Sequence, residues 1–121
     1  MAKHLKSGDG WRIGLDDESD VYCGLVGGDR WSFELTAAEF KDFCKLLCEL
    51  DETIQKISSE LMDAEKISCA AESNSIWLEA DGYPYAYDLH IITQHGRRVE
   101  GFWPAESVPG LIQASQVLRI F

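Results

Sequence analysis

Hydrophobic and polar residues alternate with a period of two in the first third of the chain. This period is typical of half-buried β-strands. The turn-forming Gly27-Gly28-Asp29 favours a hairpin between the second and third of these stretches. The residues predicted to face inward are Trp11, Ile13 and Leu15 in the first stretch, Val21, Cys23 and Leu25 in the second, and Trp31, Phe33 and Leu35 in the third.

The pattern changes from a strand period to a helical period at Thr36. Residues 36–39 read TAAE, a capping box in which Thr36 accepts from the amide of Glu39 and Glu39 reaches back. Apolar residues then recur at helical spacing, namely Phe40, Phe43, Cys44, Leu47, Leu50, Ile54, Ile57 and Leu61. The pattern predicts a helix over about residues 37–62, roughly 39 Å long at 1.5 Å per residue.

Strand patterns resume after this helix. Ile76, Leu78 and Ala80 share one face, and Tyr85, Tyr87, Leu89 and Ile91 share another. A returning strand is predicted over residues 97–103, and a second helix near Ser107 or Pro109. The order of strands, long helix, strands and shorter helix predicts an α+β fold with antiparallel sheet strands. Each half ends in an aromatic strand and an acidic helix start, RWSFELTAAE and RVEGFWPAE, which indicates a weak pseudo-repeat.

Composition and charge narrow the classes of function. The 121 residues predict one domain over 1–121, with 21 acidic against 11 basic residues and a formal net charge of -10. Such a field repels nucleic acids and anionic membranes, and it favours either solubility or a basic partner. No apolar run approaches the roughly 20 residues of a membrane span, and the first residues do not resemble a signal peptide. We therefore expect a cytoplasmic protein.

The sequence predicts no catalytic, cofactor-binding or metal-binding residues. The acidic stretch 16–20 contains no glycine, so a solvated loop is favoured over a calcium loop. The four cysteines are interpreted as small buried hydrophobic residues. Asp88 and His90 could form an acid–base pair, and a small hydrolase or ligand-binding protein is therefore kept as the second alternative.

The stretch QHGRRVEGFWP, residues 94–104, combines arginines with aromatic residues in this acidic chain. In a strand Arg97 and Arg98 point to opposite faces, and Glu100 shares the face of Arg98 and can offset its charge. The pair is therefore predicted not to form a basic patch. Single-stranded nucleic-acid binding stays the first alternative, with Arg30, Trp77 and Arg97 as its candidates.

Two surfaces are candidates for protein contacts. Trp77 lies on the face opposite Ile76 and Leu78, and an exposed tryptophan is typical of binding hot spots. The candidate interaction surface is Trp77, Arg30, Arg97 and Trp103. The long helix is predicted to extend beyond the sheet, because strands of 5–6 residues span only roughly 17–20 Å of it. The candidate dimer surface there is Ile54, Ile57 and Leu61, which predicts a homodimer.

The chain resembles a cyanobacterial family known as domain of unknown function 1818. The residues that carry the resemblance are LKSGDGWRIG at 5–14, GLVGGDRWSFELTAAEFKDFC at 24–44, ISCAAES at 67–73, GYPYAY at 82–87 and GRRVEGFWP at 96–104. The resemblance implies the fold of the Whirly and PC4-type single-stranded DNA-binding regulators and a cyanobacterial source, but no activity. Because those regulators use basic sheets, the leading prediction is a non-enzymatic interaction or regulatory module.

Overall fold

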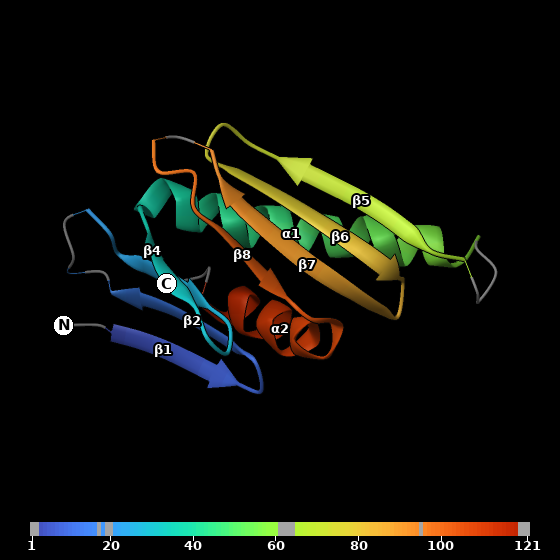
Figure 1. Cartoon of the computed structure of the whole chain (residues 1–121), viewed down its shortest axis with the longest axis horizontal. Helices are drawn as coiled ribbons and strands as arrows, with labels where there is room; N and C mark the ends of the chain where they lie inside the picture. Colours follow the sequence, from blue (N-terminus) through green and yellow to red (C-terminus); the bar gives the residue numbers. More distant parts are fainter. Residues whose placement is uncertain (1–2, 17, 19–20, 61–64, 95, 119–121) are drawn as a thin grey trace.

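The computed structural model describes residues 3–16, 18, 21–60, 65–94 and 96–118. Two runs of four strands are each followed by helical structure (Figure 1). The first run is β1 (Lys3–Gly8), β2 (Trp11–Asp16), β3 (Gly24–Gly27) and β4 (Ser32–Leu35), followed by α1 (Ala37–Ser58). The second run is β5 (Ile67–Glu72), β6 (Ile76–Tyr83), β7 (Ala86–Thr93) and β8 (Glu100–Trp103), followed by the 3₁₀ turn η1 (Ala105–Ser107) and α2 (Val108–Leu118). The predicted order of elements and the α+β class are confirmed.

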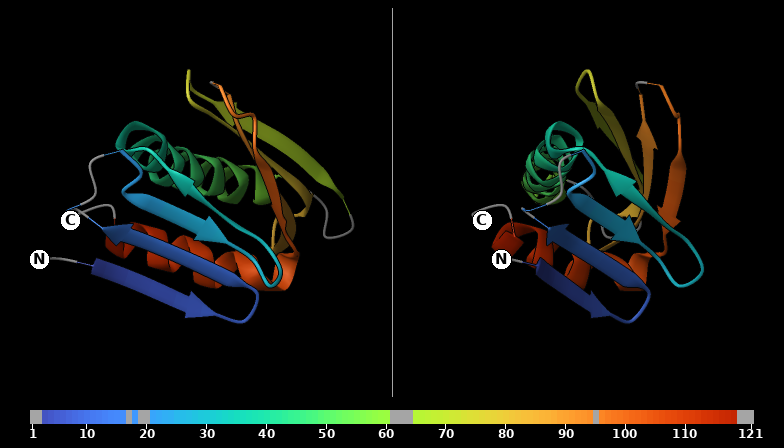
Figure 2. Two further views of the ribbon diagram at one scale, coloured as in Figure 1. Left: turned by 60° about the vertical axis from the view of Figure 1, so that its left-hand side comes forward. Right: turned by 90° about the vertical axis from the view of Figure 1, so that its left-hand side faces the viewer.

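Each run of strands forms its own antiparallel sheet. The strand orders are β1-β2-β3-β4 and β5-β6-β7-β8, so every strand pairs with its neighbours in the chain. Short connections favour this arrangement, because antiparallel neighbours need only a turn between them. The sheets lie side by side at an angle, and both helices lie on one side of them (Figure 2). One face of each sheet is therefore left without a helix.

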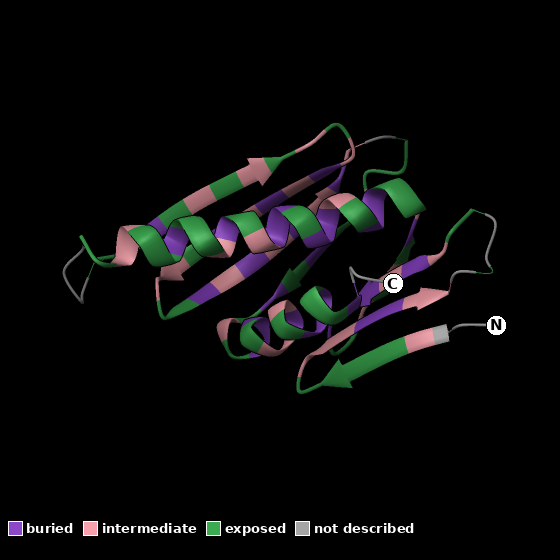
Figure 3. Ribbon diagram, turned by 180° about the vertical axis from the view of Figure 1, so that it is seen from behind, coloured by how far each residue is buried: buried purple, intermediate pink, exposed green. Residues whose placement is uncertain are grey.

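Each helix packs chiefly on the sheet that belongs to the other half of the chain. Helix α1 follows the first sheet but makes its main contacts with β5 and β6 of the second. Helix α2 follows the second sheet but lies mainly on β2 and β1 of the first. Figure 3 shows buried and exposed residues alternating along both helices, as expected when one face of a helix covers a sheet. The two halves therefore share one hydrophobic core.

Two tryptophans donate hydrogen bonds across the junction between the sheets, one in each direction. Trp103 Nε1 donates to the carbonyl oxygen of Gly27 at 2.9 Å, and Trp31 Nε1 donates to that of Phe102 at 3.1 Å. Their rings lie 4.9 Å apart. A side chain at Gly101 would overlap the Trp31 ring, so a glycine is needed where the two sheets meet.

Most of the predicted inward faces are confirmed, but two assignments are wrong. In β3 the inward residues are Gly24 and Val26, whereas Val21 is 59% exposed and lies before the strand. Hydrophobic alternation missed this register because Gly24 carries no apolar side chain; a Cβ there would come within 2.6 Å of Phe40. Tyr85 is 75% exposed because it lies in the turn between β6 and β7 rather than on the inward face.

Candidate interaction face

The outer face of the second sheet carries an unusual combination of acidic and aromatic side chains. It faces the viewer in Figure 1, with α1 behind it. Strands β5 to β8 contain no lysine or arginine. We call this surface the acidic aromatic face; its residues are Glu72, Trp77, Glu79, Asp81, Asp88, His90, Ile92, Glu100 and Phe102.

Strand alternation explains why the charges gather on one side. In β6 the residues Ile76, Leu78 and Ala80 are fully buried, which sends the intervening residues outward. The same alternation in β5, β7 and β8 turns every carboxylate of the four strands to the outer face. The core requires the inward residues, but it does not require carboxylates at the outward ones.

An aromatic stripe crosses three strands of the acidic aromatic face. The ring of His90 lies 5.5 Å from that of Trp77, in an edge-on arrangement, and 6.3 Å from that of Phe102. These residues come from β7, β6 and β8 respectively. Phe102 is 52% exposed, while Trp77 and His90 are half-buried. The stripe thus offers an apolar contact surface in the middle of the carboxylates.

Two carboxylates flank His90. Its Nε2 lies 3.8 Å from Glu100 Oε1, and Glu79 is its direct partner in the register of β6 and β7. Asp88 has a different contact, because its Oδ1 accepts from the backbone N–H of Ala105 at 3.0 Å. The contacts of His90 and Asp88 are therefore with different groups, and the acid–base pair suggested by their spacing is not formed.

Asp81 and Asp88 are direct cross-strand partners on this face. Like charges opposite each other destabilise a sheet. Asp88 has a structural role because it holds Ala105 at the start of η1. Asp81 is exposed and has no such internal partner among the described residues. The acidic aromatic face therefore contains charge that folding alone does not require.

Comparison with known proteins identifies the family but no activity. The profile described as Domain of unknown function (DUF1818) matches residues 6–118. The chain belongs to the DUF1818 family. Its structure is also similar to the crystal structure, at 1.80 Å resolution, of a protein with unknown function from the DUF155 family from Prochlorococcus sp. NATL2A. The TM-score is 0.89 and the identity 28%, over 98% of each chain. No curated protein matches the chain.

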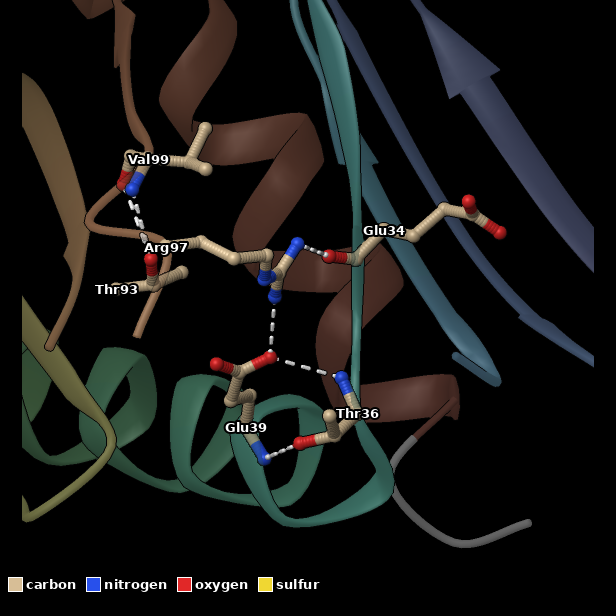
Figure 4. Close-up of polar contacts among 6 residues, drawn as sticks. All are labelled: Glu34, Thr36, Glu39, Thr93, Arg97 and Val99. Carbon is tan, nitrogen blue, oxygen red and sulfur yellow. Dashed lines mark hydrogen bonds and ion pairs between the residues drawn. The ribbon is translucent and has the colours of Figure 1, made fainter. Parts of the chain in front are cut away.

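Arg97 of this DUF1818 chain holds the two halves together. Its Nη2 lies 2.7 Å from Glu39 Oε1, and its Nη1 donates to the carbonyl oxygen of Glu34 at 2.7 Å (Figure 4). The same Glu39 oxygen accepts from the backbone N–H of Thr36 at 2.8 Å. The guanidinium also lies 4.8 Å from the ring centre of Tyr22. Arg97 is thus engaged by the first half of the chain rather than presented to a nucleic acid.

The prediction that Arg97 belongs to a strand is wrong. Strand β8 begins at Glu100, and Arg98 has a positive φ of 50°. The backbone N–H of Val99 donates to Thr93 Oγ1 at 2.9 Å, which fixes the chain after the bend (Figure 4). The chain therefore bends at Arg98, and Arg97, just before the bend, contacts Glu39.

The other residues of the predicted interaction surface are scattered. Trp103 is fully buried in the core, so its assignment to that surface is wrong. Its large side chain fills the junction between the sheets, and its indole N–H is satisfied there by a hydrogen bond. Arg30 is exposed in the turn between β3 and β4, on the first sheet. Of the four predicted residues, only Trp77 belongs to the acidic aromatic face.

The residues of the predicted dimer surface do not all lie at the surface of the structure. Ile54 is fully buried and Ile57 is half-buried, while Leu61 lies outside the described residues. Strands β6 and β7 have 8 residues each, longer than expected, and α1 packs along the second sheet. Ile54 therefore belongs to the core and is not available to a second copy.

The cysteines and other metal-ligating side chains do not gather into a metal site in the described part of the chain. Among the described residues, no group of three or more His, Cys, Asp or Glu is placed to hold a metal ion. Of the four cysteines, Cys44 is buried, whereas Cys23, Cys48 and Cys69 are half-buried. No helix within the described ranges is long and apolar enough to cross a membrane.

Sequence reasoning found Trp77 but missed Phe102 and the carboxylates around it. One signal was available: strands β5 to β8 lack lysine and arginine, although the whole chain contains 11 such residues. The pairing of Glu79 with His90 could not be predicted, because it depends on a cross-strand register that a single sequence does not fix.

Proposed function

We propose that this DUF1818 protein is a non-enzymatic cytoplasmic interaction module whose acidic aromatic face binds a basic protein segment. The observation that carries the proposal is the exposed Phe102 within a sheet face that has carboxylates and no lysine or arginine. The partner that this chemistry fits is a segment with lysine or arginine side chains around one apolar or aromatic anchor.

The two parts of the face would have separate roles in binding. Aromatic side chains such as Phe102 and Trp77 provide apolar area at little conformational cost and dominate hot spots. The carboxylates would contribute mainly to the rate of association and to partner choice, as rim charges do. The net charge of -10 adds a long-range field of the same sign.

The same observations oppose the nucleic-acid alternative. Phosphate binding requires lysine and arginine side chains on the contact surface. The second sheet has none, and Arg97 is held by Glu39 and Glu34. Two four-stranded sheets, each followed by a helix, support the Whirly-like fold that the resemblance implies. A shared fold does not carry a shared ligand.

A titration with defined probes tests the proposal. A fluorescently labelled peptide of alternating lysine and tryptophan and a labelled single-stranded oligothymidine would be titrated at low and physiological salt. We expect the peptide to bind the wild-type protein. Glu79→Gln should lower the rate of association, more at low salt than at physiological salt, and Phe102→Ser should weaken binding about tenfold. Mutations at a hot spot commonly cost that much.

The first sheet provides matched controls. Leu5 is 69% exposed and Glu34 is exposed on that sheet, so Leu5→Ser and Glu34→Gln remove the same kinds of group from another face. Both should leave peptide affinity unchanged within twofold. Equal losses from the two sheets would mean that the peptide responds only to net charge. Tight oligothymidine binding with a steep salt slope would replace the proposal with the nucleic-acid alternative.

A further inference from the structure

A cleft separate from the acidic aromatic face lies where α1, the β6–β7 turn and α2 meet. Its volume is about 320 Å³, within the range of small-molecule sites, which is roughly 300–1,000 Å³. The residues that define it are Asp51 and Gln55 from α1, Tyr85 and Tyr87 from the turn and β7, and Pro109 and Ile112 from α2. Three segments that are distant in sequence therefore build one cavity.

Asp51 is the only charged residue among the described residues that line the cleft. Its Oδ1 accepts from the hydroxyl of Tyr87 at 2.6 Å and from Nε2 of Gln55 at 3.4 Å. Gln55 Nε2 also donates to the carbonyl oxygen of Pro84 at 3.3 Å. These bonds fix the carboxylate, and among the described residues none donates to its Oδ2. One oxygen of a held carboxylate is thus left for a ligand.

Tyr87 acts as a permanent donor to this carboxylate. Burial raises the pKa of the Tyr87 hydroxyl above its usual range, and its hydrogen bond to Asp51 and the negative charge of Asp51 raise it further. The hydroxyl therefore stays protonated and keeps Oδ1 occupied. A further polar ligand would meet the carboxylate through Oδ2.

We infer that the cleft binds an organic cation, with an ammonium or guanidinium group at Asp51 and its hydrocarbon chain against the tyrosine, proline and isoleucine walls. A single carboxylate in an apolar cleft fits a group that carries one positive charge and a short apolar chain. The exposed Tyr85, which stacks on Tyr83 at 5.6 Å, adds an aromatic face at the rim for a cation–π contact.

The cation could be a free amine or a lysine side chain of a peptide, and two probes separate these sources. Cadaverine (1,5-diaminopentane) and Nα-acetyl-lysine methylamide would be titrated into ¹⁵N-labelled protein, with amide shifts as the readout. We expect saturable shifts of residues around Asp51 and Tyr87 with at least one probe. Tighter binding of cadaverine assigns the site to free amines, and tighter binding of the lysine derivative assigns it to peptides.

Asp51→Asn is the decisive variant, because the asparagine oxygen can still accept from Tyr87 while the charge is lost. It should weaken binding about tenfold or more, whereas Glu52→Gln, which removes a neighbouring exposed charge on the same helix, should change it less than twofold. Should Asp51→Asn fail to fold, 1-pentanol decides with the wild-type protein. The inference is overturned if pentanol binds as tightly as cadaverine, if Asp51→Asn binds normally, or if neither cation binds at millimolar concentration.

Discussion

The two sheets of this protein have the same strand order and different outer faces. Each is a four-stranded antiparallel meander, each ends in a strand that runs directly into a helical start, and each sends one tryptophan indole to a carbonyl of the other. The strands of the first sheet carry both charge signs, including Lys6, Arg12 and Glu34. The strands of the second carry carboxylates and no lysine or arginine.

This comparison separates what the fold needs from what it does not need. Features present in both halves, such as the inward alternation and the tryptophan exchange, belong to the architecture. The acidic aromatic face occurs in the second half alone, although the first half folds the same topology with mixed charge. The difference therefore supports a binding role for the second sheet, and variants that compare its two faces test that reading.

The largest effect is expected when the two faces of the second sheet are compared through their tryptophans. Trp103 is fully buried, so Trp103→Ala should lower the free energy of unfolding by about 3–5 kcal/mol. Trp77 lies half-buried on the outer face, and Trp77→Ala should cost about 1 kcal/mol, mainly its edge-on contact with His90. Urea denaturation measures both. Equal costs would show that the outer face is covered in solution.

The next effect concerns the contact that joins the halves. Arg97→Ala leaves the carboxylate of Glu39, which is 6% exposed, without its cation. Loss of one partner of a buried pair costs about 3–5 kcal/mol; the partial exposure of Arg97 reduces the expected cost to about 2–3 kcal/mol. Arg98→Ala is the matched control and should stay within about 0.5 kcal/mol. If both variants unfold alike in urea, Arg97 does not join the halves.

Much of the fold could be predicted because it follows from local patterns. The capping box at Thr36, the helical repeat of α1 and the alternation in β6 and β7 are all properties of consecutive residues. The errors fell where a distant partner decides the structure. Gly24 faces inward because Phe40 covers it, and Ile54 is buried because the second sheet lies over α1.

The candidate sites were less predictable than the fold for the same reason. Arg97 looked like a strand residue because nothing nearby in sequence indicates that it pairs with Glu39, 58 residues away. The cleft around Asp51 combines residues of three segments, and neither Asp51 nor Tyr87 lies in a recognisable motif. Trp77 could be predicted because alternation alone places it outward. Which residues surround it could not be predicted, because that depends on the register between β6 and β7.

A smaller effect is expected from the Tyr87 hydroxyl of the second sheet, which donates to Asp51 of α1. Tyr87→Phe removes the 2.6 Å hydrogen bond to Asp51 and should cost about 1.5–2 kcal/mol, as for a bond to a charged group. Because the folded-state pKa of Tyr87 is raised, the unfolded state loses its proton first, and wild-type stability should fall above about pH 10. The variant lacks this component of the alkaline loss. Urea denaturation at pH 8 and pH 10.5 measures it, and parallel losses in both proteins would contradict the prediction.

The smallest effect compares the two helix starts. Thr36 accepts from the backbone N–H of Glu39 at 3.2 Å, so Thr36→Ala should cost about 1 kcal/mol. Pro104 occupies the corresponding position before η1 but makes no side-chain cap bond; Asp88 on β7 supplies the acceptor instead. Pro104→Ala should therefore cost only about 0.5 kcal/mol, through greater freedom of the unfolded chain.

Thr36→Ala combined with Arg97→Ala should cost less than the sum of the two single variants, because both act on Glu39, whereas Pro104→Ala with Arg97→Ala should be additive. Additivity in the first pair, measured by chemical denaturation, would mean that the cap and the arginine contact stabilise α1 independently.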